Sequence, residues 1–327
     1  MPTDAADACR DADGIIYPPL GMAGSHIADR TGVPSVLASL VPVSRTGEFP
    51  AVGGPDLHVG RTYNRLTYAI GDQMGWQPFR RLVNGWRVET LGVPPAPFLG
   101  PMRSIDHRRR PVLYGFSPSI VPRPPDWGPH IRVTGYWFSQ PDDRWQPPPD
   151  LAHFLDSGPP PVYAGFGSMT DREPARVARI VLEALRRAEC RAVVLSGWAG
   201  LAGVTDPPRV HFVDSVPHNW LFPKTAAVVH HWGAGTTHAG LLAGAPTVVV
   251  PFFTDQPFWG ARVADLGVGP RPIPRSDLSV DRMAAALRRT TRDSGMRVRA
   301  RVIGERIRAE DGVAQAVRAL CDMWPVA

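Results

Sequence analysis

The sequence has no hydrophobic run long enough to cross a membrane. Its longest apolar stretches, such as the one that ends at Val250, fall far short of the roughly 20 residues that a membrane-spanning helix needs. The opening stretch MPTDAADACRDADG is acidic and lacks the basic segment and apolar core of a secretory signal. We therefore expect a chain without a membrane span.

Cysteine is also scarce. The three cysteines, Cys9, Cys190 and Cys321, are odd in number and widely scattered, which gives neither a disulfide framework nor a metal-ligand spacing. The one Asp-x-Asp match, Asp11 to Asp13, precedes a predicted strand and is attributed to chance, and no cluster of His, Asp and Glu has the spacing of a metal site. These absences predict a cytoplasmic protein that holds no metal.

Lysine is almost missing. Lys224 is the only lysine among 36 basic residues, so 36 − 1 leaves 35 arginines, and the formal net charge is +6. Together with 37 prolines, this imbalance is typical of a coding bias rather than of a nucleic-acid binding surface. The basic runs at 106–111 and 297–308 are interrupted or helical and fit a solvated helix face. We expect no nucleic-acid partner, although a mild positive field favours an anionic small substrate.

Short apolar runs alternate with helix-like segments in the first part of the chain. The runs at 12–18, 111–117 and 131–137 predict strands, and residues 60–92 predict a long helical region that is broken near 71–75. This alternation favours an α/β fold with mainly parallel strands.

A polar, proline-rich stretch at 141–158 has the stiffness expected of an interdomain linker. A second series of strands and helices begins at 159–169. We therefore expect two domains, at residues 1–140 and 159–327, whose strand carboxyl ends line a ligand site.

The stretch VVHHWGAGTTHAGLLAGAPTVVVPFFTDQ (228–256) contains a strand, a glycine-bracketed turn and a helix. Gly233, Ala234 and Gly235 allow the backbone to approach a ligand closely, and the free N–H groups of a helix start favour a phosphate. Thr236 and Thr237 are candidate helix caps, and His231 is placed to donate to the same oxygens. An ordinary strand–turn–helix joint explains the stretch about equally well.

A dinucleotide-binding fingerprint is a rival interpretation. Gly233-x-Gly235 follows a predicted strand, and Asp255 comes 20 residues after Gly235, where such enzymes carry a ribose-binding acid. However, His238 occupies the position of the third glycine, and the unit lies late in its domain. The fingerprint is therefore disfavoured.

Two further elements indicate what the ligand carries besides phosphate. GFGSM (165–169) is another glycine-flanked turn, and it offers the Ser168 hydroxyl. Asp255 and Gln256 form a carboxylate–amide pair that suits vicinal hydroxyls, although Asp255 equally fits a helix N-cap. Phosphates together with a polyhydroxylated end predict a nucleotide sugar.

The stretch VPHNWLFPKTAAVVHHWGAGTTHAGLLAGAPTVVVPFFTDQPFWGARVADLGVGP (216–270) resembles the donor-binding signature of the family 1 glycosyltransferases. It is most similar to the sterol-type and antibiotic branch, and PVLYGFSPSIVPRPPDWGPHIRVTGYWF (111–138) resembles the interdomain region of that branch. The resemblance covers essentially the full chain. It implies a GT-B fold with two Rossmann-like domains and inverting, metal-independent transfer of a hexose.

The implied donor is a UDP- or dTDP-sugar, which is a co-substrate rather than a cofactor, and the implied acceptor is a hydroxyl of a lipophilic molecule such as a sterol or polyketide made in secondary metabolism. The resemblance assigns the diphosphate to His231 and to residues Gly233, Ala234, Gly235 and Thr236, with Ser168 reaching the phosphates. It assigns the nucleobase of the donor to the peptide at Val216 and to His218, although His218 equally suits a surface helix cap. It assigns the sugar hydroxyls to Asp255 and Gln256.

Two features depart from the family pattern. Trp232 stands where the family has a small residue. The chain also opens on a stretch that resembles the middle of the family's first domain, without the glycine-rich turn that supplies the catalytic Asp or His. The first domain is therefore expected to be incomplete at its amino-terminal side, with exposed strand edges that favour self-association.

The catalytic base is accordingly unassigned. His26, Asp72 and His107 are the available candidates in the first domain, and packing or capping explains His26 better than catalysis does. Two alternatives to a transferase remain open, a non-catalytic nucleotide-sugar binder or partner subunit and, less favoured, a related GT-B epimerase.

Overall fold

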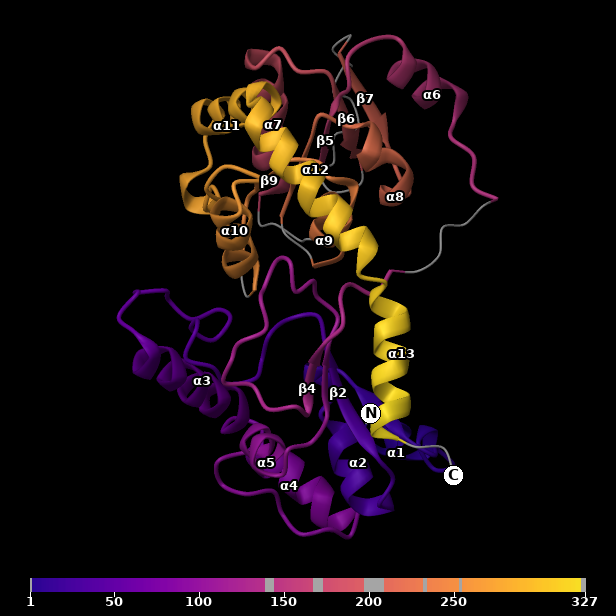
Figure 1. The fold of residues 1–327 in the computed structure, drawn as a ribbon, viewed down its shortest axis with the longest axis vertical. Coiled ribbons are helices and arrows are strands. Elements are labelled where there is room, and N and C mark those ends of the chain that lie inside the picture. Colours follow the sequence, from indigo (N-terminus) through magenta and orange to yellow (C-terminus); the bar gives the residue numbers. More distant parts are fainter. Residues whose placement is uncertain are drawn as a thin grey trace. The chain divides into compact units, whose positions relative to one another are not determined.

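The computed structural model describes residues 2–138, 144–166, 173–196, 209–231, 234–252 and 255–324 (Figure 1). Its contacts divide the chain into two compact units. The first consists of Met1–Trp137 together with Glu310–Ala327, and the second of Phe138–Ala309. Each unit contains one parallel sheet, which confirms the α/β fold with parallel strands.

The sheet of the first unit has four parallel strands in the order β1-β2-β3-β4. Their bounds are β1 Ile15–Tyr17, β2 Ser35–Ser39, β3 Val112–Tyr114 and β4 Ile131–Val133. Register is set by pairs such as Leu37 with Val112 and Leu113 with Arg132. The central strand β3 is buried along its whole length, as expected for a parallel sheet that is covered on both faces.

Helices of the first unit are α1 Pro2–Ala8, α2 Ala23–Thr31, α3 Arg61–Trp76, α4 Arg80–Glu89, α5 Pro101–His107 and α13 Gly312–Met323, with a 3-10 turn η1 at Pro19–Gly21. The predicted break near 71–75 is wrong, because α3 runs through both glycines and ends at Trp76. The interruption instead contains Pro78, which has no N–H to continue a helix.

Helix α13 belongs to the first unit, although residues 159–327 were predicted to form one domain. In Figure 1 the yellow α13 lies beside the indigo elements of the other end of the chain. Ala319 packs in a core cluster with Val36 and Leu113. Glu310 accepts hydrogen bonds from the hydroxyls of Ser117 at 2.6 Å and Ser119 at 2.8 Å. These contacts tie the segment to the first sheet.

The sheet of the second unit has five parallel strands in the order β7-β6-β5-β8-β9. Their bounds are β5 Val162–Gly165, β6 Ala192–Leu195, β7 Val210–Val213, β8 Ala227–His230 and β9 Thr247–Val249. On one side of β5 lie β6 and then β7, and on its other side lie β8 and then β9. The point where the order reverses therefore lies between β5 and β8.

Helices of the second unit are α6 Pro149–Asp156, α7 Pro174–Arg187, α8 His218–Leu221, α9 Ala234–Ala243, α10 Gln256–Asp265, α11 Val280–Arg292 and α12 Ser294–Ala309, with 3-10 turns η3 Phe222–Lys224 and η4 Arg275–Asp277. Alternating strand residues face two separate cores. Val162 and Ala164 pack with residues of α7 and α11, whereas Tyr163 packs with Leu221 and Phe222. Within the predicted linker 141–158, the structure forms the helix α6.

Candidate functional site

The carboxyl ends of β5, β8 and β9 meet at one edge of the second sheet. Gly165 pairs with His230, and His230 pairs with Val249, so the segments that follow these strands start side by side. In open parallel sheets, ligands bind outside the carboxyl ends at the point where strand order reverses. That point lies between β5 and β8, directly at the turn that the sequence singled out.

His231 follows β8 immediately and is buried, with 7% of its surface exposed. Burial lowers the pKa of its imidazole to about 4, so the ring is neutral at pH 7. Its Nδ1 has no hydrogen-bond partner among the described residues. A buried polar atom without a partner costs about 1–3 kcal/mol, and it gains most from a ligand that supplies one.

Helix α9 begins at Ala234, one residue earlier than the predicted start at Gly235. Thr236 and Thr237 therefore lie in its first turn and not at the N-cap position. A Cβ added to Gly235 would meet no described atom within 4 Å, so no described residue fills the space above this turn. The unpaired N–H groups and positive dipole end of a ten-residue helix face that space.

Four histidines gather around the end of β8. His230 is fully buried, and its pKa is held well below the usual value, first by burial and then by repulsion from His231, His218 and His238. Burial lowers the pKa of His238 to about 3, and its ring meets Trp259 edge-on at 5.6 Å. Within the described ranges, no three His, Cys, Asp or Glu side chains are arranged to hold a metal ion. Because the pKa values of all four imidazoles are lowered, the rings are neutral at pH 7.

Asp255 and Gln256 behave differently from one another. Asp255 occupies the N-cap position of α10 but makes no capping bond, and its carboxylate instead accepts from Trp259 Nε1 at 3.2 Å. Burial raises the pKa of this half-buried carboxyl. Gln256 is buried, and its Oε1 accepts from the backbone N–H of Phe252 at 2.5 Å. The Gln256 side chain is therefore bonded to a backbone group four residues earlier, whereas the Asp255 carboxylate is held by Trp259.

Val216 and His218 lie in the segment that follows β7. Val216 is buried in the core on the Tyr163 face of the sheet. His218 is the first residue of α8, and its ring stacks on Phe222 at 4.4 Å and meets Tyr163 edge-on at 5.7 Å. Burial lowers the pKa of His218. Packing therefore fixes the ring, which is not a free surface cap.

Some predicted site residues lie outside the described part of the chain. They are Ser168, Gly233 and the unexplained Trp232, and the side chain of Ala234 is likewise not described. The site therefore has described members after β7, after β8 and at the start of α10.

The base candidates in the first unit are now better defined. His26 is buried on α2, and its Nδ1 lies 2.7 Å from Arg87 Nη1. Burial and the Arg87 charge lower the pKa of His26 to about 4. Burial, with a contribution from Asp106, raises the pKa of Asp72 to about 6. The side chain of His107 is not described. His26 is thus held by packing and by Arg87, as the packing interpretation predicted.

Two supporting residues escaped the reasoning from sequence. Trp259 is completely buried, holds the Asp255 carboxylate and contacts His238, so it links α10 to α9. Ser196 donates to the carbonyl oxygen of Val213 at 3.1 Å and also bonds Asp214, which joins the ends of β6 and β7. The sequence signal that could have indicated Trp259 was its position four residues after Asp255 at the start of a helix.

A family model described as the C-terminal domain of the erythromycin biosynthesis protein CIII-like proteins matches residues 179–323. The sterol 3-beta-glucosyltransferase of Emericella nidulans is 41% identical over an aligned length of 326, and the alignment covers 96% of this chain and 23% of the relative. The sterol 3-beta-glucosyltransferase UGT80A2 of Arabidopsis thaliana is 39% identical over 97% of this chain and 49% of its own length. The chain thus spans from about a quarter to half of these relatives.

Solved structures show the same architecture. The glycotransferase of kitacinnamycin superposes with a TM-score of 0.74 at 21% identity, over 99% of this chain and 80% of that one. The glycosyltransferase VinC, solved in complex with dTDP, gives 0.66 at 22% identity, over 99% and 75%. At these identities the likeness establishes the fold, which is GT-B. Across the described helices, none is long and apolar enough to cross a membrane.

Proposed function

We propose that the chain binds a UDP- or dTDP-sugar and transfers its hexose to a hydroxyl of a lipophilic acceptor. The match of residues 179–323 to the C-terminal domain of the EryCIII-like proteins supports this proposal. The names of its relatives, sterol 3-beta-glucosyltransferases, support a sterol-like acceptor and a glucosyl donor. The dTDP bound by VinC supports a pyrimidine nucleotide. The three free cysteines support a cytoplasmic location.

One observation carries the proposal: the unpartnered Nδ1 of His231 lies at the start of α9, where the order of the strands reverses. A diphosphate at this edge accepts a hydrogen bond from the neutral imidazole and further bonds from the N–H groups of the helix start. Both interactions strengthen as negative charge builds up on the leaving diphosphate. The same site therefore binds the donor and favours its cleavage.

The sugar is assigned to Asp255. Its carboxylate is half-buried and already held by Trp259 on one side, which supports a fixed acceptor for a sugar hydroxyl. Gln256 takes a supporting role, because its carbonyl oxygen is engaged by Phe252. The nucleobase is assigned to the segment from Val216 to His218, with Ser168, Gly233, Ala234, Gly235 and Thr236 completing the phosphate end.

The chemistry is a single displacement. The acceptor oxygen attacks the anomeric carbon on the face opposite the diphosphate, so a new C–O bond forms while the bond to the β-phosphate breaks and the configuration inverts. The nucleoside diphosphate leaves with the electron pair, and the acceptor proton passes to a base. We propose that no metal takes part, because hydrogen bonds from His231 and from the N–H groups of the helix start stabilise the negative charge of the leaving group.

A second candidate function is nucleotide-sugar binding without transfer. The bond between His26 and Arg87 favours it, because this bond removes a base candidate of the first unit. Both functions use the same donor site, and they differ only in acceptor activation.

Calorimetry of the folded 327-residue chain with UDP and dTDP tests the donor site, and we expect binding of at least one of them. Absence of binding to both, with the protein folded by circular dichroism, would sink both functions. Incubation with UDP-glucose and a sterol then separates them, since only the transferase yields a sterol glucoside. Product formation should be unchanged by a chelator if no metal is required.

A further inference from the structure

A hollow in the second unit lies at the opposite edge of its sheet from the candidate donor site. It has a volume of about 850 Å³. Its lining residues include those that open or directly precede the strands, among them Val162, Arg191, Arg209, Ala226 and Pro246. Cavities of roughly 300–1,000 Å³ are typical of small-molecule sites.

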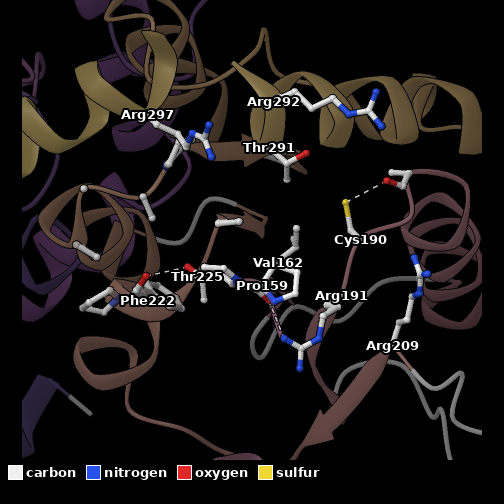
Figure 2. Close-up of a pocket in the computed structure, with 18 of the residues that line it drawn as sticks. Pro159, Val162, Cys190, Arg191, Arg209, Phe222, Thr225, Thr291, Arg292 and Arg297 are labelled. Carbon is white, nitrogen blue, oxygen red and sulfur yellow. Dashed lines mark hydrogen bonds between the residues drawn. The ribbon is translucent and has the colours of Figure 1, made fainter. Parts of the chain in front are cut away.

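Arginines from four separate segments line this hollow. They are Arg191 before β6, Arg209 before β7, Arg292 at the end of α11, and Arg297 and Arg301 on α12. Figure 2 shows Arg292 and Arg297 coming from the helices above, with Arg191 and Arg209 below. Glu189 is the one carboxylate in the lining, so the formal charge is 5 − 1 = +4. We call this set the arginine pocket.

Two of these arginines are committed to the protein backbone. Arg191 donates to the carbonyl oxygens of Pro159 at 2.7 Å and of Phe154, and its guanidinium stacks on the Phe154 ring at 4.3 Å. Arg209 donates to the carbonyl oxygen of Glu189 at 3.3 Å. They form a fixed positive wall.

The other three are uncommitted. The side chains of Arg292, Arg297 and Arg301 make no hydrogen bond or ion pair with any residue in the described ranges. Arg297 and Arg301 are four residues apart on α12, so they project from the same face of the helix. Helix α12 packs closely on the residue that follows α9, because a Cβ added to Gly244 would lie 3.0 Å from the Arg301 Cα.

We propose that the arginine pocket binds a small molecule that carries two phosphate groups, at a site separate from the nucleotide-sugar site. A guanidinium binds a phosphate through two parallel N–H···O bonds, and adjacent phosphates match two guanidiniums that lie one helical turn apart. Arg292 approaches from a second helix, and the fixed wall adds a favourable field. This site goes beyond the proposed transfer reaction, because it lies at the other edge of the sheet.

Cys190 provides a reporter inside the pocket. Its thiol belongs to the lining and is partly buried, and burial raises its pKa. In a Cys9→Ser/Cys321→Ser background, Cys190 is the only thiol of the chain. A bound phosphate compound covers it and slows its reaction with a maleimide.

The test is calorimetry with pyrophosphate in metal-free buffer, using the full chain saturated with UDP. We expect pyrophosphate to bind at one site and to slow maleimide labelling of Cys190. The Arg297→Ala/Arg301→Ala variant should lose about a hundredfold in affinity, about tenfold for each arginine. Arg306→Ala removes an exposed arginine from the same helix outside the pocket, and it should leave the affinity unchanged.

Absence of pyrophosphate binding overturns the proposal, and so does an equal affinity in the double variant and in Arg306→Ala. Competition by UDP also overturns it, because the ion would then occupy the donor site. Failure of UDP itself to bind counts against the proposed function and not against this pocket. Flotation with vesicles that contain a lipid diphosphate separates the sources: co-flotation that the double variant loses identifies a lipid headgroup, and its absence beside pyrophosphate binding identifies a soluble ligand.

Discussion

Replacing His231 by leucine should separate donor binding from stability. The substitution removes a buried Nδ1 that lacks a partner among the described residues, and it leaves an apolar side chain of similar size in a site that is 7% exposed. An unpaired buried polar atom costs about 1–3 kcal/mol, so the free protein should be as stable as before or more stable by up to that amount. The fall of the His231 pKa from 6.5 to about 4 reflects the same unfavourable burial.

Affinity for UDP should change in the opposite direction. A hydrogen bond to a charged phosphate contributes about 1.5–3 kcal/mol, so His231→Leu should weaken UDP binding by about tenfold to a hundredfold. His231→Asn is the matched control, because its amide keeps a donor near the position of Nδ1 and should retain part of the affinity. Thermal unfolding without ligand and calorimetry with UDP measure the two quantities.

Two results would refute this reasoning. Unchanged UDP affinity in a folded His231→Leu protein would remove His231 from the donor site. A large loss of stability in the same variant would show that Nδ1 is satisfied in the free protein. Either result would also withdraw the observation on which the proposed function depends.

Three further predictions concern other parts of the molecule. Asp255→Ala should weaken binding of UDP-glucose by about tenfold but leave UDP nearly unaffected, because the carboxylate is assigned to the sugar; equal losses in calorimetry would contradict that role. Acidification from about pH 6.5 towards 4 should lower the free energy of unfolding, because His230 and His238 have lowered pKa values in the folded state and the unfolded chain takes up protons first; a flat pH profile in urea titrations would count against it. Gly312→Ala should destabilise the first unit by about 1–3 kcal/mol, because the added Cβ overlaps the carbonyl oxygen of Tyr136; an unchanged melting temperature would argue against that close approach.

Local patterns predicted the elements of the second unit well. The continuous apolar runs before His231 and Pro251 became the buried strands β8 and β9, because a parallel sheet covered on both faces buries every side chain. The placement of His231 at a strand end followed directly from that pattern.

Properties that depend on loop closure or on tertiary packing were not predictable. The residue type of Gln256 suits a sugar, but its carbonyl oxygen is used by the N–H of Phe252, and that bond depends on how the loop closes. Likewise, the apolar stripe of α13 indicates that one face is buried but not against which sheet. The helix was therefore assigned to the second domain, whereas Ala319 packs in the first.

The return of α13 to the first unit has a consequence for how the chain matures. Residues 138–309 are contiguous, so the second unit has all its parts as soon as they leave the ribosome. The first unit starts earlier, with β1 at Ile15. It lacks Glu310 and α13 until nearly three hundred residues after β1 have been made. During translation the second unit is therefore finished before the first unit, which waits for α13.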